Sequence, residues 1–163
     1  MAGANWRGKD WCYARMGGDN LSGVDLSNAN LNGVDLSNAD LSGTDLSGAD
    51  LSGANLTGAD LSNADLSYSV LDYANLTNAN LRNANLQIAD LKYAYLTGAD
   101  LFNANLRFAH LDYAHLDFAD LSNANLYNAD LSYASLSGVN WFSTTCPDYT
   151  NSDDNGNTCV NNL

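Results

Sequence analysis

The sequence contains very little of what helices are usually built from. There is no glutamate, one glutamine and two lysines, whereas Asn, Asp, Ser and Gly are abundant. Because these four residue types favour caps and turns over helix interiors, the composition predicts almost no helix. No apolar run approaches the roughly 18 residues of a transmembrane helix, and the N-terminus lacks the apolar segment of a signal peptide.

Basic residues are also scarce. Six Lys and Arg stand against 19 acidic residues, all of them Asp, which gives a formal net charge of -13. A charge of this sign argues against direct binding of nucleic acid through phosphate contacts and against binding to an anionic membrane. At 163 residues, the chain has room for one domain.

A leucine occurs at every fifth position from Leu21 to Leu136, 24 times in succession. The residue two before it is Ala in 19 of these repeats, and the residue just before it is mostly Asp or Asn. A period of five fits neither the 3.6 of a helix nor the 2.0 of a flat strand. Two apolar residues around one polar residue suit a short strand, and the Ser, Gly or Asn that follow suit a turn. The array therefore predicts a solenoid that turns after every short strand.

This A(D/N)LXX pattern, seen in residues 49–53 and 99–103, resembles the pentapeptide repeat family over about residues 19 to 142. The resemblance implies an all-β fold, a right-handed quadrilateral β-helix with four pentapeptides to a coil. It also implies that the leucine and the small residue point inward, in about six full coils of 20 residues. Because the core is filled and the outer walls are convex, we expect a non-enzymatic protein without a cofactor.

Residues 20 apart should stack at ~4.8 Å in such a coil, and like residues do recur at this spacing. Aromatic residues form two columns on neighbouring faces: Tyr73, Tyr93, Tyr113 and Tyr133 in one, and Tyr68 and Phe108, with Ile88 between them, in the other. Stacked aromatics can be purely structural pairs, worth ~0.2 to 1 kcal/mol each. Exposed rows of rings are also where a solenoid would gain affinity for a protein partner, so both columns form our candidate interaction face.

Aspartates form further columns on two walls. Asp40, Asp60, Asp100 and Asp120 would stack on one wall, and Asp25, Asp45 and Asp65 on the next. Family members that protect DNA gyrase present a negative surface resembling B-form DNA, so the resemblance implies an alternative function, an acidic DNA mimic that binds gyrase or another DNA-binding protein. Many of these positions alternate with Asn, which suits an uncharged hydrogen-bonding ladder equally well.

The two ends depart from the repeat, so we predict three parts. Residues 1–18 would form a degenerate capping coil with Trp6 and Trp11, residues 19–142 the β-helix, and residues 143–163 a polar flap. We expect Cys146 to bond to Cys159, a closure worth ~3 kcal/mol, and the tail resembles that of some cyanobacterial family members. A disulfide indicates an oxidising compartment such as a periplasm or thylakoid lumen. The alternative is a cytoplasmic protein in which both cysteines are free thiols.

Metal sites are not expected, although one segment resembles part of a calcium loop. Asn151, Asp153 and Asn155 alternate like the first ligands of such a loop, but its twelfth position is Asn162 rather than a bidentate Glu. The two histidines, His110 and His115, would lie on adjacent faces and could not easily share a metal ion. We therefore predict a monomer without metal or cofactor, whose partner is a protein of unknown identity.

Overall fold

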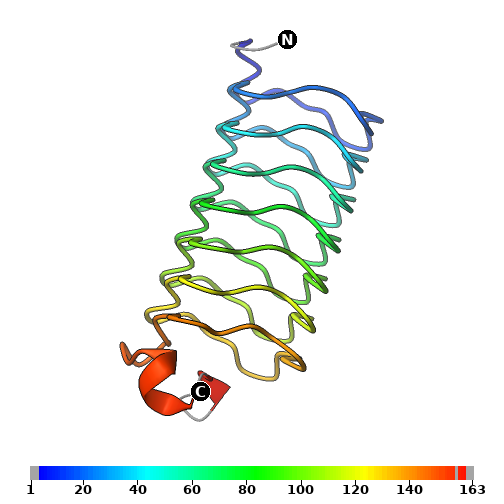
Figure 1. The fold of residues 1–163 in the computed structure, drawn as a ribbon. Coiled ribbons are helices and arrows are strands. Elements are labelled where there is room, and N and C mark those ends of the chain that lie inside the picture. Colours follow the sequence, from blue (N-terminus) through cyan, green and yellow to red (C-terminus); the bar gives the residue numbers. More distant parts are fainter. Residues whose placement is uncertain (1–3, 157, 161–163) are drawn as a thin grey trace.

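The computed structural model describes residues 4–156 and 158–160. Most of these residues form a four-sided solenoid. Every fifth residue pairs in parallel with the residue 20 positions further on, from Asn5 with Asp25 to Asn125 with Thr145. Each turn therefore contains four bridging residues and has four sides, and the coils follow one another in chain order from end to end (Figure 1). The predicted fold, a right-handed quadrilateral β-helix with almost no helix, is confirmed.

Backbone hydrogen bonds explain why five residues make one side. The N–H of Leu21 donates to the carbonyl of Asp40 in the next coil at 2.8 Å, and the N–H of Val24 returns to the carbonyl of Leu21 at 3.1 Å. The second residue after each leucine adopts the left-handed conformation, with φ of 64° at Gly23 and 57° at Asn28. Gly and Asn tolerate this conformation best, which explains why they recur at this position. We call the second residue after each leucine the corner, because the chain turns there from one side of the coil to the next.

Where Asp or Asn precedes the leucine, its side chain stabilises the same turn. Asp40 Oδ1 accepts the N–H of Ser42 at 3.1 Å and its hydroxyl at 2.7 Å. The Ser42 hydroxyl and then the N–H hold the pKa of Asp40 below its usual value, with burial acting weakly in the opposite direction. The repeat therefore pairs Asp or Asn before the leucine with Ser or Thr after it because the two residues form one Asx turn.

The core is a column of leucines and small residues. The leucines from Leu21 to Leu131 are buried, together with the alanines that precede them, and Leu136 is partly buried. Two polar exceptions are hydrogen-bonded: the Thr44 hydroxyl donates to the carbonyl of Leu21 at 3.0 Å, and that of Ser69 to Leu66 at 2.7 Å. Burial of each leucine contributes about 1.5 to 3 kcal/mol, so the filled core stabilises every coil through its neighbours.

The winding begins earlier than the leucine array. Asn5 and Thr145 lie seven 20-residue turns apart, so about one turn of the winding precedes the six full coils predicted from the leucine array. Trp6 and Trp11 take leucine positions in the first coil, with ring centroids 4.8 Å apart, and both pack against the core. Large apolar side chains at these positions therefore preserve the coil. A capping role for residues 1–18, and the boundaries of the three parts, remain predictions.

The C-terminal flap reverses the chain over the last coil. An antiparallel bridge joins Thr145 to Asn151, and the 3₁₀ helix η1 follows at Ser152–Asn155 (Figure 1). Cys146 stands at a leucine position of the repeat and is bonded to Cys159, and both sulfur-bearing side chains are fully buried. The predicted disulfide is therefore confirmed, and it ties the flap to the end of the core.

The calcium-like segment is used for capping in this structure. Asn151 Oδ1 accepts the N–H of Asp153 at 2.9 Å, as the N-cap of η1, and both carboxylate oxygens of Asp153 accept hydrogen bonds from Ser143. Asn162 lies outside the described residues. Among the residues that the structure describes, no three His, Cys, Asp or Glu side chains are grouped to hold a metal ion. No helix within the described ranges is long and apolar enough to cross a membrane.

Candidate interaction faces

The tyrosine column is a regular stack of rings. Consecutive centroids from Tyr73 through Tyr93 and Tyr113 to Tyr133 are 4.9, 5.0 and 4.9 Å apart, with interplanar angles of 2°, 10° and 12°. The predicted stacking is confirmed. Exposure falls to 39% at Tyr93 inside the stack and rises to 81% at Tyr133, whose outer ring face is open.

The hydroxyls of this stack form a row of hydrogen-bond donors. Partial removal from water raises the pKa of Tyr113, and the neighbouring tyrosines Tyr133 and Tyr93 and the Asp112 carboxylate reinforce this shift. A raised pKa keeps the hydroxyl protonated at neutral and mildly alkaline pH. Tyr113 therefore offers a neutral donor above its apolar ring edge, within a stack of rings about 5 Å apart.

Sequence reasoning missed a second stack beside the tyrosines. The rings of Tyr95 and His115 lie 5.0 Å apart and nearly parallel, on the wall that follows the tyrosine corner. Phe118 is 69% exposed, and its ring lies so close to Gly138 that an added Cβ there would be 2.7 Å away. The 20-residue spacing contained the signal for the Tyr95–His115 pair, but the two residues are of different types.

The second aromatic column does not form a continuous ring stack. Tyr68 is 61% exposed and Phe108 is 37% exposed, with Ile88 at the same corner between them. Phe108 instead meets Tyr127 edge to face, with centroids 5.7 Å apart. The Arg107 guanidinium lies 5.3 Å from the Tyr127 ring centre. The structure therefore combines Phe108 with residues that sequence reasoning did not select.

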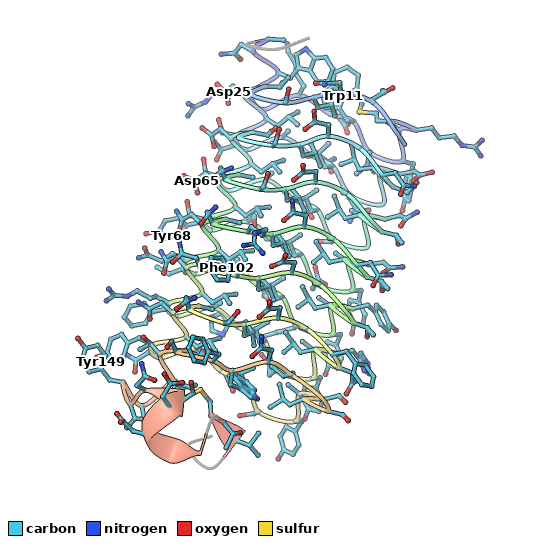
Figure 2. The ribbon with its side chains drawn as sticks, in the orientation of Figure 1. Trp11, Asp25, Asp65, Tyr68, Phe102 and Tyr149 are labelled. Carbon is cyan, nitrogen blue, oxygen red and sulfur yellow. A yellow bond between two sulfur atoms is a disulfide. The ribbon has the colours of Figure 1, made fainter. Side chains whose placement is uncertain are left out.

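An open cleft lies at the C-terminal end of this column. It has a volume of about 580 Å³ and is lined by Arg107, Tyr127, Asn128, Pro147, Asp148 and Tyr149. Tyr149 comes from the flap and contacts Tyr127 edge to face, with centroids 5.2 Å apart. Tyr149 is at the lower end of the same edge that bears Tyr68 (Figure 2). The last coil and the disulfide-tied flap thus build this cleft together.

The aspartate columns stack as predicted, and asparagine interrupts them. Asp25, Asp45 and Asp65 bridge in succession, whereas Asn80 separates the pair Asp40 and Asp60 from the pair Asp100 and Asp120. Asn amides donate across the coils: Asn80 to Asp60 at 2.9 Å, Asn20 to Asp40 at 2.9 Å and Asn85 to Asp65 at 3.0 Å. The same positions therefore form a hydrogen-bonding ladder and a negative surface at once.

His110 and His115 lie on different walls, as expected. His110 bridges to Asp90 on one side and to Asp130 on the other. The pKa of Asp130 is lowered, chiefly by the Ser132 hydroxyl and N–H, with smaller contributions from His110 and Lys92. Asp130 is thus held by the same Asx turn as the other aspartates.

The chain matches the family model of pentapeptide repeats in eight copies, over residues 20–58, 59–98, 83–112 and 104–140. Comparison with the curated proteins found no match.

Solved structures of pentapeptide repeat proteins are similar to the chain. HetL of the cyanobacterium Nostoc sp. strain PCC 7120, involved in heterocyst differentiation regulation, is 30% identical; the match covers 93% of this chain and 88% of that chain, with a TM-score of 0.31. A protein from the thylakoid lumen of Arabidopsis thaliana is 32% identical, over 70% of this chain and 72% of that chain, with a TM-score of 0.42. Because the repeat model matches most of the sequence, the chain belongs to the pentapeptide repeat family.

Proposed function

We propose that the protein is a non-enzymatic interaction scaffold that binds a protein partner through its two aromatic columns. The observation that carries the proposal is the stack from Tyr73 to Tyr133, four rings held parallel at the surface. Rings ordered before binding lose little conformational freedom when a partner arrives. Tyrosine also combines a large apolar area with a polar tip, which suits a protein contact.

The winding itself does not require tyrosine at this corner. Gly33 and Gly53 occupy the same corner in earlier coils, with φ of 61° and 63°, and the backbone there is the same. Tyr93 adopts φ of 57°, a conformation that costs a bulky residue more than it costs Gly or Asn. A surface role is therefore a better explanation of the tyrosines than a backbone requirement.

The experiment replaces the inner rings of the stack with the residue that this corner tolerates best. A partner is first captured with the wild-type chain and identified by mass spectrometry. The double variant Tyr93→Asn, Tyr113→Asn should keep the coil and lose binding of this partner. Tyr13→Asn is the matched control, because Tyr13 is 74% exposed and also has a positive φ of 56°, but lies at the N-terminal end of the chain. Equal partner affinity of the double variant and the wild-type chain would refute the proposed face.

A second candidate, the acidic DNA mimic, is favoured by one observation. No Lys or Arg occurs between Met16 and Leu81, while Asp25, Asp45 and Asp65 bridge in one column there. The turn hydrogen bonds of these carboxylates use Oδ1 of each, which leaves Oδ2 of Asp45 and Asp65 for a partner, whereas Oδ2 of Asp25 accepts the Asn5 amide at 3.3 Å. DNA gyrase supercoiling measured with and without the protein tests this candidate, and normal supercoiling at micromolar protein would end it.

A further inference from the structure

One wall of the solenoid changes its charge halfway along its length. Its bridging column consists of Asp25, Asp45 and Asp65 in the early coils, and of Asn85, Asn105 and Asn125 in the later ones. The residues after the leucines on the same wall change too, from serine to Gln87, Arg107 and Tyr127. Asp25, Asp65, Tyr68 and Tyr149 follow one another down this edge (Figure 2). In the later half of this wall, the bridging column is therefore uncharged, and the cationic Arg107 lies beside it.

Arg107 has no ionic partner in the part of the chain that the structure describes. The ion pair found there joins Arg82 to Asp100 at 2.8 Å, and Arg82 also lies over the Phe102 ring at 4.3 Å. The Arg107 side chain is exposed, and its guanidinium lies 5.3 Å from the centre of the Tyr127 ring and 5.7 Å from that of Phe108. Such stacking positions a guanidinium but leaves its N–H donors available for a carboxylate.

The flap completes the cleft around this cation. The N–H of Asn128 donates to the carbonyl of Pro147 at 2.9 Å, and the N–H of Tyr149 donates to the carbonyl of Cys146 at 3.0 Å. The Asp148 carboxylate also lines the cleft, where its Oδ1 accepts the N–H and hydroxyl of Thr150 at 3.0 and 2.7 Å. The N–H and hydroxyl of Thr150 therefore bind one oxygen of this carboxylate. The Arg107 guanidinium, beside the rings of Tyr127 and Phe108, is the group that a ligand would contact.

We propose that this cleft binds a carboxylate-bearing residue in an extended segment of the protein partner. The carboxylate would bind Arg107, and the flanking apolar groups would pack on Tyr127, Tyr149 and Pro147. The proposal rests on the scaffold function and adds the charge and shape of the segment that is recognised. An extended segment suits the site because Phe108 contacts Tyr127, which lines the cleft, and the bridging column of this wall is neutral there.

A polyanion is a poor occupant of the same cleft. The net charge of the chain is -13, and Asp90, Asp130 and Asp120 lie on the adjacent walls. A single carboxylate can approach the cation between these walls, whereas a run of phosphates would meet repulsion from both sides. Charge complementarity is therefore local, and it selects one acidic side chain set among apolar neighbours.

The test uses two blocked pentapeptides as probes, acetyl-Gly-Pro-Glu-Tyr-Gly-amide and its Gln counterpart, titrated against the ¹⁵N-labelled full chain. The Glu peptide should produce saturable shifts at the Asn128, Asp148 and Tyr149 amides, and the Gln peptide should bind roughly tenfold more weakly. Arg107→Ala should weaken the Glu peptide by a similar factor. Arg82→Ala is the matched control, because the Arg82 cation is already paired, and it should leave binding unchanged.

Several outcomes would overturn the proposal. These are no saturable shift with the Glu peptide, equal binding of the two peptides, or binding that survives Arg107→Ala. Displacement of the Glu peptide by inorganic phosphate at equal concentration would show a general anion site instead. The peptides need no natural partner, so this failure is distinct from a failure of the tyrosine variants to lose partner affinity.

Discussion

The early coils, which contain Asp25, Asp45 and Asp65, and the late coils, which contain Asn85, Asn105 and Asn125, have the same backbone. The two halves differ in the side chains that they present to solvent. Both halves use the same bridges and the same buried leucine column. The early half presents Asp columns and mainly Gly or Asn corners, whereas the late half presents stacked tyrosines, Tyr95 with His115, and the Arg107 cleft. The difference shows that the winding fixes the inward residues, whereas the outward residues vary within what the corner conformation and the Asx turn tolerate.

The largest expected effect comes from removing what is unique to the late half, the disulfide that holds the flap. Replacing Cys146→Ala and Cys159→Ala should lower the free energy of unfolding by about 3 kcal/mol, because the closed loop no longer restricts the unfolded chain. Urea unfolding measures this loss, and amide exchange should rise most in residues 143–160. Unchanged exchange in the flap would show that its other contacts suffice.

The next test makes the late half resemble the early half. Asn85→Asp with Asn105→Asp would extend the acidic column and remove two cross-coil hydrogen bonds, from Asn85 to Asp65 at 3.0 Å and from Asn105 to Asn85 at 2.9 Å. We expect a destabilisation of about 1 to 3 kcal/mol that added salt partly reverses.

The control for this variant adds the same charge without stacking it. Asn63→Asp with Asn123→Asp places the two carboxylates at corners three coils apart, and urea unfolding should show a smaller loss. If both pairs of substitutions destabilise the chain equally, total charge rather than the ladder decides stability.

A smaller effect compares a corner glycine from each half. Gly138→Ala would place a Cβ 2.7 Å from the Phe118 ring, whereas Gly53→Ala meets nothing within 4 Å. Both substitutions are strained by a positive φ, so we expect Gly138→Ala to cost about 1 kcal/mol more. Thermal unfolding of the two variants checks this, and equal costs would mean that the Phe118 ring moves away freely.

The smallest effect is the response to acid. Hydrogen bonds from the serine hydroxyls, then from the serine N–H groups, lower the pKa of Asp25, Asp35 and Asp40 from the ordinary value of 3.8. A lowered folded-state pKa means that this stabilisation is complete above the ordinary value and is lost as pH falls through the folded value. Urea unfolding should therefore show a free energy of unfolding that decreases as pH falls below about 3.8. A higher free energy of unfolding at pH 3 than at pH 6 would reverse the predicted sign.

The sequence predicted the fold because the period of five fixes which residues point inward. Stacking at 20 residues was implied by the family resemblance and supported by like residues recurring at that spacing, and it placed Tyr93 against Tyr113 correctly. The Arg107 cleft was not predictable in this way, because Tyr149 reaches it only through the path of the flap after Cys146. A degenerate first coil was predictable because Trp6 and Trp11 stand at leucine positions of the repeat, and the structure shows its bridges.

The central claim is that the tyrosine stack serves binding and that the backbone does not depend on it. The most direct measurement uses one variant with Tyr73, Tyr93, Tyr113 and Tyr133 all replaced by Asn, and records partner affinity and unfolding free energy together. We predict that binding is lost while stability changes by less than about 2 kcal/mol, because lost stacking is offset by relief of the left-handed conformation. Retained partner affinity with a collapse in stability would contradict the claim.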